Sequence, residues 1–262
     1  MIKDKLYIIP NNEEIDEYIK LAGEYNLHFE YNDFFLPQVL DDTGLCEKII
    51  ESYKAIPALP ADNTLHGAFL DVTIFSNDSK IRSISEERIR SGMTTAEKLG
   101  AKAVIIHTNY ITNFHDDSYE NSWVEKNAAF IMKMKEEYPG VSIYMENMFD
   151  TNPRLIARLA ERLKDCDNFG ICLDYAHVCV FGKECEPSEW METLAPYIKH
   201  IHLNDNLLER DDHLPLGEGL IDISEFWKLY ERFCPDATVL IEVKGLDKIR
   251  TSLLYLQKIN MI

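Results

Sequence analysis

Short apolar segments alternate with amphipathic segments along the whole chain. Most of the apolar segments are continuous rather than alternating with polar residues, which is typical of parallel strands buried on both faces. They predict eight strands, at Leu6–Ile9, His28–Tyr31, Thr64–Phe69, Ala103–His107, Val141–Glu146, Phe169–Asp174, Ile198–Leu203 and Thr238–Val243.

The segments between these strands carry the signals of helices. Apolar residues recur at three- and four-residue spacing in Ile15–Ala22, Cys46–Tyr53, Glu86–Leu99 and Trp123–Glu137. Residues that favour helix starts indicate further helices at Asn152-Pro153, at Ser188 before Glu189-Trp190, at Asp222 before Ile223–Phe233, and at Gly245 before Leu246–Leu256.

Eight strands, each followed by a helix, predict an α/β fold that is either a closed (β/α)8 barrel or a doubly wound sheet. The strand count favours the barrel, also called a TIM barrel, and 262 residues fit one such domain, which needs about 250 residues. The sequence has no GxGxxG or GxxxxGKS/T motif, which disfavours a nucleotide-binding sheet. We therefore expect a single TIM-barrel domain over residues 1–262.

The composition also indicates the cellular location of the protein. No apolar run approaches about 20 residues, so we expect no membrane span. The first residues lead into a strand without the apolar region or cleavage site of a signal peptide. The six cysteines lack CxxC spacing, which is typical of reduced thiols in a chain of this length. Together these features predict a cytoplasmic protein.

The chain is strongly acidic, with 27 Lys and Arg against 45 Asp and Glu and a net charge of −18. A protein that binds nucleic acid usually carries clustered basic residues that neutralise phosphates. No stretch combines several basic residues with aromatic ones. DNA is therefore a less favoured partner than a small molecule. A net charge of −18 would still be compatible with a local basic groove.

Ionisable side chains lie at the ends of six predicted strands. They are His66, His107, Glu146, Asp174, His202 and Glu242. The C-terminal ends of the strands form the active-site face of a TIM barrel, so we expect these side chains to converge. Such groups are costly to bury without partners, and four or more nitrogen and oxygen ligands suit a divalent cation. The set predicts a metal site at this face.

Three further candidate ligands lie in loops. His177 follows Asp174 by three residues, and Asp211 and His213 form an Asp-x-His in the loop after the seventh strand. Each of them alone would be interpreted as a solvated loop residue. Together they predict a second cluster of ligands.

The motifs around these residues resemble those of the xylose-isomerase-like barrel superfamily. They read His66-Gly-Ala-Phe, Glu146-Asn, Leu173-Asp-Tyr-Ala-His, His202-Leu-Asn-Asp and Asp211-Asp-His-Leu-Pro-Leu-Gly-Glu-Gly. The resemblance extends over nearly the whole chain and implies a TIM barrel with a metal site. The superfamily includes sugar epimerases, sugar-phosphate isomerases and endonuclease IV, so the resemblance is less specific for the reaction.

The resemblance implies two alternative metal arrangements. The sugar epimerases hold one metal with residues that match Glu146, Asp174, His202 and Glu242. Endonuclease IV holds three zinc ions with those four and with five more, which match His66, His107, His177, Asp211 and His213. We therefore expect one to three divalent ions per chain, Zn²⁺ or Mn²⁺.

Other positions differ from the endonuclease IV pattern. The loop after the second strand reads Asn32-Asp-Phe-Phe-Leu-Pro and has no arginine that could enter a DNA duplex, and the segment between His202 and Asp211 is short. With the acidic composition, these differences favour isomerase or epimerase chemistry on a small sugar or sugar phosphate.

In this first hypothesis a bound metal acidifies a carbon-bound proton, Glu146 and Glu242 act on opposite faces of the substrate as base and acid, and His177 polarises a substrate oxygen. Lys244 could contact a phosphate. The alternative is a trinuclear zinc phosphoesterase of the endonuclease IV type. A barrel that only senses a small ligand is the least favoured interpretation. Barrels of this kind often pair, so a homo-oligomer is also considered.

Overall fold

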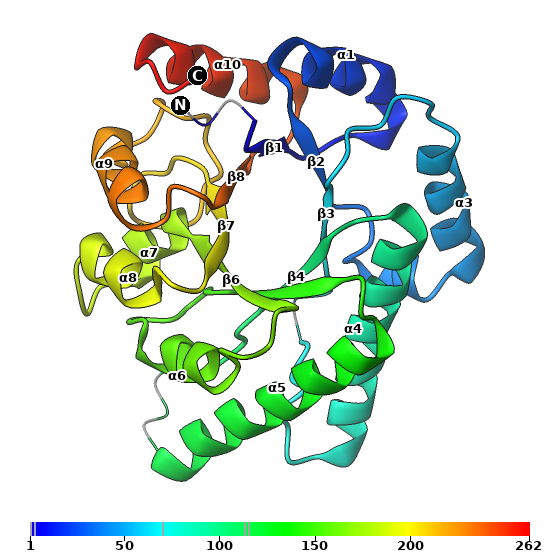
Figure 1. The fold of residues 1–262 in the computed structure, drawn as a ribbon, viewed down its shortest axis with the longest axis vertical. Helices are drawn as coiled ribbons and strands as arrows, with labels where there is room; N and C mark the ends of the chain where they lie inside the picture. Colours follow the sequence, from blue (N-terminus) through cyan, green and yellow to red (C-terminus); the bar gives the residue numbers. More distant parts are fainter. Residues whose placement is uncertain (1, 3, 70, 113, 115) are drawn as a thin grey trace.

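The computed structural model describes residues 2, 4–69, 71–112, 114 and 116–262. Its strands are β1 (Leu6–Ile8), β2 (His28–Tyr31), β3 (Thr64–His66), β4 (Ala103–His107), β5 (Ser142–Glu146), β6 (Phe169–Asp174), β7 (Ile198–Leu203) and β8 (Thr238–Ile241). Each strand pairs in parallel with the next, and β8 pairs with β1, which closes the barrel. The expected TIM barrel is confirmed (Figure 1).

A ring of helices surrounds the barrel (Figure 1). They are α1 (Ile15–Tyr25), α3 (Thr43–Lys54), α4 (Ser79–Leu99), α5 (Asp117–Glu137), α6 (Arg154–Arg162), α7 (Tyr175–Phe181), α8 (Pro187–Leu194), α9 (Ile223–Phe233) and α10 (Leu246–Lys258). A short helix α2 (Pro37–Leu40) precedes α3, and a 3-10 turn η1 (Asn12–Glu14) precedes α1. Within the described part of the chain, no helix is both long and apolar enough to cross a membrane.

Side-chain caps define several helix starts. The carboxylates of Asp42, Asp78, Asp116 and Asp222 accept hydrogen bonds from backbone N–H groups in the first turns of α3, α4, α5 and α9. These donors have no partner within a helix, so the caps stabilise its first turn. At the other end, α4 stops at Gly100, whose φ of 67° is a left-handed conformation that glycine adopts without strain.

Several predicted helix starts are shifted. Helices α3, α4 and α5 begin at Thr43, Ser79 and Asp117 rather than at Cys46, Glu86 and Trp123. Helix α6 begins at Arg154 instead of Pro153, because the side chain of Asn152 accepts a hydrogen bond from the Arg154 N–H and holds Pro153 outside the helix. Helix α8 begins at Pro187, so Ser188 lies inside the helix rather than capping it. Proline at the first helical position explains this earlier start, because its missing N–H needs no partner there.

Strand boundaries also differ from the prediction, since β1 ends at Ile8 rather than Ile9 and β5 begins at Ser142 rather than Val141. Strand β3 ends at His66 rather than Phe69, and β8 ends at Ile241 rather than Val243. The helices α2 and α7 were not predicted. Helix α7 was missed because its seven residues directly follow β6 without a loop. Asp174 makes this sharp transition by capping α7 through the N–H of His177.

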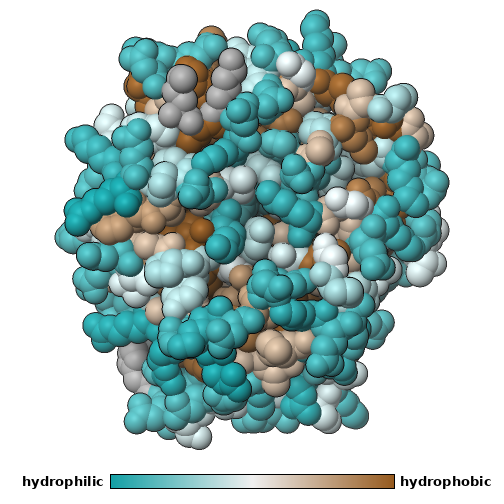
Figure 2. Space-filling model, viewed as in Figure 1, coloured by the Kyte–Doolittle hydropathy of each residue, from teal (hydrophilic) through white to brown (hydrophobic). Residues whose placement is uncertain are grey.

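Helices and strands share one apolar core. Its largest completely buried side chains include Trp123 on α5, Trp190 on α8 and Phe226 on α9, which belong to a continuous cluster with the strand residues. The face seen in Figure 2 is mostly hydrophilic, with small scattered apolar areas. The six cysteines are free thiols, as expected. The core therefore connects the strands of the barrel to the surrounding helices.

The site end of β3 requires a close approach between two backbones. The N–H of Gly67 donates to the carbonyl of Ile105 on β4 at 2.9 Å. A Cβ on Gly67 would lie 2.8 Å from this same oxygen and 2.9 Å from Cγ1 of Val104. Because a backbone oxygen cannot move aside cheaply, only glycine fits directly after His66.

We expect Gly67→Ala to lower the free energy of unfolding by about 1–3 kcal/mol, because it overpacks this contact. Gly23→Ala is the matched control, since a Cβ there would have no neighbour within 4 Å. In the exposed last turn of α1 it should raise stability by up to about 1 kcal/mol through helix propensity. Urea denaturation measures both, and a Gly67→Ala protein as stable as the parent would contradict the close approach.

Candidate metal centre

The ionisable side chains at the predicted strand ends lie together in the structure. His66, His107, Glu146 and Asp174 are the last residues of β3, β4, β5 and β6, His202 is the penultimate residue of β7, and Glu242 directly follows β8. The sheet register places His107 opposite Glu146 and Asp174 opposite His202. All six are buried, and none is more than 8% exposed.

Glu146 lies at the centre of this group and is 1% exposed. Its Oε2 is 3.3 Å from Nε2 of His107 and 3.9 Å from Nε2 of His66. Its Oε1 is 3.3 Å from Nδ1 of His202. Among the described residues, neither oxygen has a hydrogen-bond partner. The carboxylate therefore has imidazole nitrogens on both sides, as expected for a group that bridges two cations.

Asp174, His202 and Glu242 form a second group on one side of Glu146. One ligand atom from each of the three lies within 4.8 Å of the others, and Nδ1 of His202 is 3.6 Å from Oε1 of Glu242. Oε2 of Glu242 accepts only a long hydrogen bond of 3.4 Å from Asn204. Two carboxylates and an imidazole are thus buried together.

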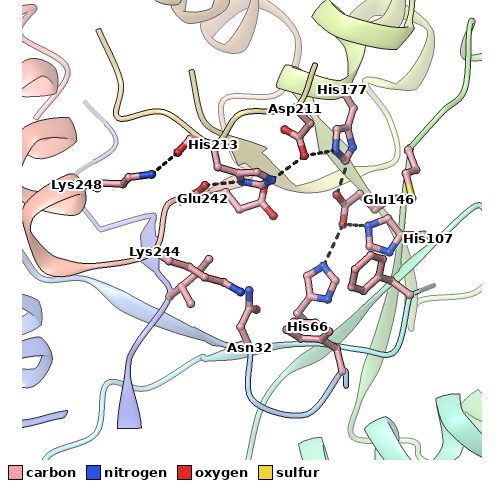
Figure 3. A pocket seen from close by; sticks show the side chains of 14 residues that line it. Asn32, His66, His107, Glu146, His177, Asp211, His213, Glu242, Lys244 and Lys248 are labelled. Atoms are coloured by element: carbon pink, nitrogen blue, oxygen red, sulfur yellow. Dashed lines mark hydrogen bonds and ion pairs between the residues drawn. The ribbon is translucent and has the colours of Figure 1, made fainter. Parts of the chain in front are cut away.

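The three candidate ligands from the loops form a third group. Oδ2 of Asp211 lies 2.7 Å from Nε2 of His213 and 3.3 Å from Nε2 of His177, so the carboxylate lies between the two rings (Figure 3). His177 is held on α7 by the Asp174 cap. His213 has a φ of 47°, a left-handed conformation that is rare for a residue with a side chain and points to a constraint at this position.

Backbone carbonyls fix the orientation of three histidine rings. Their Nδ1 atoms lie 2.9–3.0 Å from a carbonyl oxygen, in the pairs His66 with Gly67, His177 with Asn147 and His213 with Glu242. A carbonyl oxygen only accepts hydrogen bonds, so each Nδ1 carries a proton, and Nε2 is the nitrogen that can bind a cation when the ring is neutral. Histidines that bind metals are commonly held in this way.

Burial and charge compete in setting the pKa values. Burial alone would raise the pKa of Glu146, but the charges of His107 and His202 outweigh it and hold this pKa well below its usual range. At Glu242 burial dominates and raises the pKa to about 7. Burial alone would lower the pKa of His213, but its contact with Asp211 and the charge of Glu242 raise it to about 10. The carboxylates therefore favour positive charge beside them.

The group fits a divalent cation. Buried ligand atoms without a hydrogen-bond partner among the described residues include both oxygens of Glu146, Oδ2 of Asp174, Nδ1 of His202 and Oδ1 of Asp211. Buried polar atoms without partners are rare and costly, and a cation between them would satisfy them. Imidazole and carboxylate together suit Zn²⁺ and Mn²⁺. The candidate ligand clusters are present at the expected face, whereas the identity and number of ions stay predictions.

A cavity of about 380 Å³ lies over the candidate ligands. Aromatic rings form part of its wall. The ring centroid of Phe69 is 5.4 Å from that of Phe35, 5.6 Å from that of His66 and 5.1 Å from that of His107. The cavity thus combines a polar floor with an apolar side.

Two lysines line the same cavity, and Figure 3 shows both on the side opposite His107. Nζ of Lys244 lies 5.2 Å from the ring centroid of Phe35. Nζ of Lys248 donates to the backbone carbonyl of His213 at 3.2 Å. Neither ammonium group forms an ion pair with a carboxylate of the described residues. Positive charge is therefore available to a ligand.

Two buried residues beside the candidate ligands were missed by the sequence analysis. Glu30 lies inside β2, with Oε1 3.1 Å from Nε2 of His202 and Oε2 3.3 Å from Nε2 of His200. Cys172 on β6 lies within reach of Glu146 and His202. A glutamate within an apolar strand was a usable signal for Glu30, whereas a cysteine in such a strand is ordinary.

Residues 40–259 match a protein family described as the xylose isomerase-like TIM barrel. A relative from Methanocaldococcus jannaschii, described as uncharacterised, is 28% identical over 209 residues, which cover 75% of this chain and 70% of the relative. A probable endonuclease 4 of Campylobacter concisus is 25% identical over 209 residues, which cover 70% of this chain and 71% of the relative.

Solved structures share the fold. A zinc-soaked protein of Thermus thermophilus has a TM-score of 0.77 and 22% identity, with 97% of each chain covered. A D-tagatose 3-epimerase-like protein has a TM-score of 0.73 and 22% identity, also with 97% of each chain covered. At this identity the likeness concerns the fold alone. An endonuclease and an epimerase-like protein thus occur among the relatives and structural neighbours.

We expect Zn²⁺ to stabilise the metal-free protein, because a cation would neutralise buried carboxylates in the folded state only. At a Zn²⁺ concentration 100 times the dissociation constant, the free energy of unfolding should rise by about 2.7 kcal/mol. Asp174→Asn keeps a side chain that can cap α7 but should lose most of this gain. Asp16→Asn, at an exposed position of α1, should keep all of it. Thermal unfolding with and without Zn²⁺ measures the effect, and an equal response of both variants would contradict the assignment.

Proposed function

Since the chain belongs to the xylose isomerase-like TIM-barrel family, we propose that it is a metal-dependent hydrolase of small phosphate esters. The observation that carries this proposal is the position of Glu146, whose two oxygens each lie 3.3 Å from an imidazole nitrogen, of His107 on one side and of His202 on the other.

This geometry favours hydrolysis over proton transfer between two glutamates. An acid–base glutamate needs an oxygen within hydrogen-bond reach of the substrate. Glu146 is enclosed by imidazoles instead. Five candidate ligands also lie outside the single-metal arrangement and would have no ligand role in it, namely His66, His107, His177, Asp211 and His213. A three-metal arrangement uses all of them, so the order of the two hypotheses drawn from the sequence is reversed.

A named relative supports the same chemistry. The protein of Campylobacter concisus is a probable endonuclease 4, and an endonuclease cleaves phosphodiester bonds. It aligns with most of this chain. The likeness supports cleavage of a phosphoester bond by this chain. It does not identify the substrate that contains the bond.

The chain offers ligands for three ions. His66, His107 and Glu146 would hold one, Glu146, Asp174, His202 and Glu242 a second, and His177, Asp211 and His213 a third. When bound, the ions supply Lewis acidity, which lowers the pKa of water and stabilises the charge of a phosphoryl group. Phe35 and Phe69 keep one side of the cavity apolar, which strengthens the attraction between charges inside it.

The cavity favours a small phosphorylated substrate. A volume of about 380 Å³ is in the range of small-molecule pockets. Lys244 and Lys248 bring positive charge to a chain whose net charge is −18. A DNA duplex would need a wide basic surface to neutralise successive phosphates, which this composition does not favour. The two lysines therefore suit the single phosphate group of a small ester.

Isomerase or epimerase chemistry on a sugar or sugar phosphate is the second candidate. Glu146, Asp174, His202 and Glu242 are a complete single-metal set, and Glu242 lines the cavity. Under this hypothesis the other five candidate ligands would be dispensable for the reaction, which separates the two functions experimentally.

We expect the Zn²⁺- or Mn²⁺-loaded protein to hydrolyse p-nitrophenyl phosphate or bis(p-nitrophenyl) phosphate. His107→Ala should lower kcat/KM by at least about 100-fold, because a bound ion supplies several kcal/mol of charge stabilisation. Release of p-nitrophenol measures the rate. Conversion of ketoses that persists in His107→Ala, without any ester hydrolysis, would favour the second candidate.

Elemental analysis of protein purified without chelator distinguishes the two candidates independently of substrate. About three ions per chain in the parent, falling to about two in His213→Ala, are expected from the three ligand groups. A single ion that is unaffected by His213→Ala would confine the site to Glu146, Asp174, His202 and Glu242.

Lys244→Ala and Lys248→Ala should each raise KM for p-nitrophenyl phosphate by roughly tenfold, from the loss of about 1.5 kcal/mol of interaction with a charged group. Lys20→Ala removes an equal charge from an exposed position of α1 and should leave KM unchanged. Steady-state kinetics at constant ionic strength measure the three variants. Equal KM values in all three would contradict a role of the cavity lysines.

A further inference from the structure

A polar cluster below the candidate ligands is not used by the proposed reaction. Glu30 on β2, Thr64 on β3 and His200 on β7 are completely buried inside the protein. Oγ1 of Thr64 donates to Oε2 of Glu30 at 2.8 Å, and Nε2 of His200 lies 3.3 Å from the same oxygen. Nδ1 of His200 in turn contacts the hydroxyl of Thr238 at 2.6 Å. One oxygen of Glu30 is therefore anchored from two strands.

The other oxygen of Glu30 lies beside a candidate metal ligand. Oε1 is 3.1 Å from Nε2 of His202. Nδ1 of the same ring is 3.3 Å from Glu146 and 3.6 Å from Glu242. The two ring nitrogens thus have separate surroundings, because Nε2 faces Glu30 and Nδ1 faces the candidate metal centre. The contact with Glu30 is close but not aligned as a hydrogen bond, so it acts through charge and proximity.

We propose that Glu30 is a positioning residue that keeps the ring proton of His202 on Nε2 and leaves Nδ1 available to a divalent cation. A neutral imidazole carries one ring proton, and its surroundings select the nitrogen. A carboxylate oxygen at 3.1 Å would repel a bare nitrogen lone pair, so the proton is favoured on Nε2. A carboxylate in this position also makes the other nitrogen a stronger ligand.

The cost of burying Glu30 argues against a role in packing alone. A completely buried carboxylate loses its hydration, and apolar side chains of similar volume often stabilise a core more than a buried ionic group does. Thr64 and His200 recover only part of this cost at Oε2. The contact with His202 gives this buried charge a functional role, because it acts on a candidate metal ligand.

The inference rests on the metal centre and not on the identity of the reaction. It can therefore be tested with Zn²⁺ alone, by competition against a chelating dye. Glu30→Gln keeps the size of the side chain and removes its charge, and Glu30→Ala removes the side chain. Several Zn²⁺ ions that bind with different affinities would give separate steps in the titration. The step that is lost in Asp174→Ala belongs to the ion held by Asp174, His202 and Glu242.

We expect Glu30→Gln to weaken Zn²⁺ binding at this position by about tenfold and Glu30→Ala by up to about 100-fold, the range found when a partner of a histidine ligand is removed. His200→Gln is the matched control, because His200 contacts the same carboxylate but is not one of the nine ligands predicted from the sequence. It should lower the stability of the metal-free protein in urea, as the Glu30 variants do, but change the Zn²⁺ affinity by less than about twofold.

The outcomes separate this inference from the proposed function. If Glu30→Gln and Glu30→Ala bind Zn²⁺ like the parent, or if His200→Gln weakens binding equally, Glu30 is only a core residue and the inference is wrong. Glu30→Gln preserves volume, so the test holds even if Glu30→Ala does not fold. A parent protein that binds Zn²⁺ but hydrolyses no ester would overturn the proposed function and leave the test of Glu30 intact. A parent that binds no Zn²⁺ would overturn both.

Discussion

The buried carboxylate of Glu146 is the feature on which the rest of the site depends. A charge that is 1% exposed is stable only if positive charge or hydrogen-bond donors lie close to it. Here the neighbours are imidazole nitrogens on both sides, at 3.3 Å from each oxygen. Imidazole can satisfy this demand as a protonated cation or as a ligand to a metal. The surrounding residues therefore need to include histidines rather than only ordinary core side chains.

The barrel meets this demand because its parallel strands end at one face. Neighbouring strands carry their last residues to the same level, so His107 lies opposite Glu146 and Asp174 opposite His202 without any contribution from loops. The loop residues depend on additional devices. Asp174 both ends a strand and caps α7, which brings His177 to the site. His213 reaches its position through a left-handed backbone conformation.

The same scaffold accommodates two chemistries, and the surroundings of the four central ligands decide between them. A single-metal site would leave a glutamate oxygen open to a substrate. In this chain, imidazole nitrogens of His66 and His107 lie 3.9 and 3.3 Å from one oxygen of Glu146. Lys244 and Lys248 add positive charge to the far side of the cavity. The two lysines bring positive charge to the cavity, although the overall charge of the chain is strongly negative.

Most of the fold could be predicted from sequence because its signals are local. Continuous apolar runs located all eight strands, and apolar spacing together with helix-start residues located most of the helices, since these signals depend on neighbouring residues. Six of the nine candidate ligands could be named because strand ends share one face, and His177, Asp211 and His213 could be named from the motifs in the loops. The sequence did not determine which of them meet, since distances across a barrel arise only when it closes. Glu30 shows this limit, because nothing local reveals that a glutamate in β2 reaches a histidine in β7. The order of the two functional hypotheses likewise followed from the tertiary structure, which places imidazoles against both oxygens of Glu146.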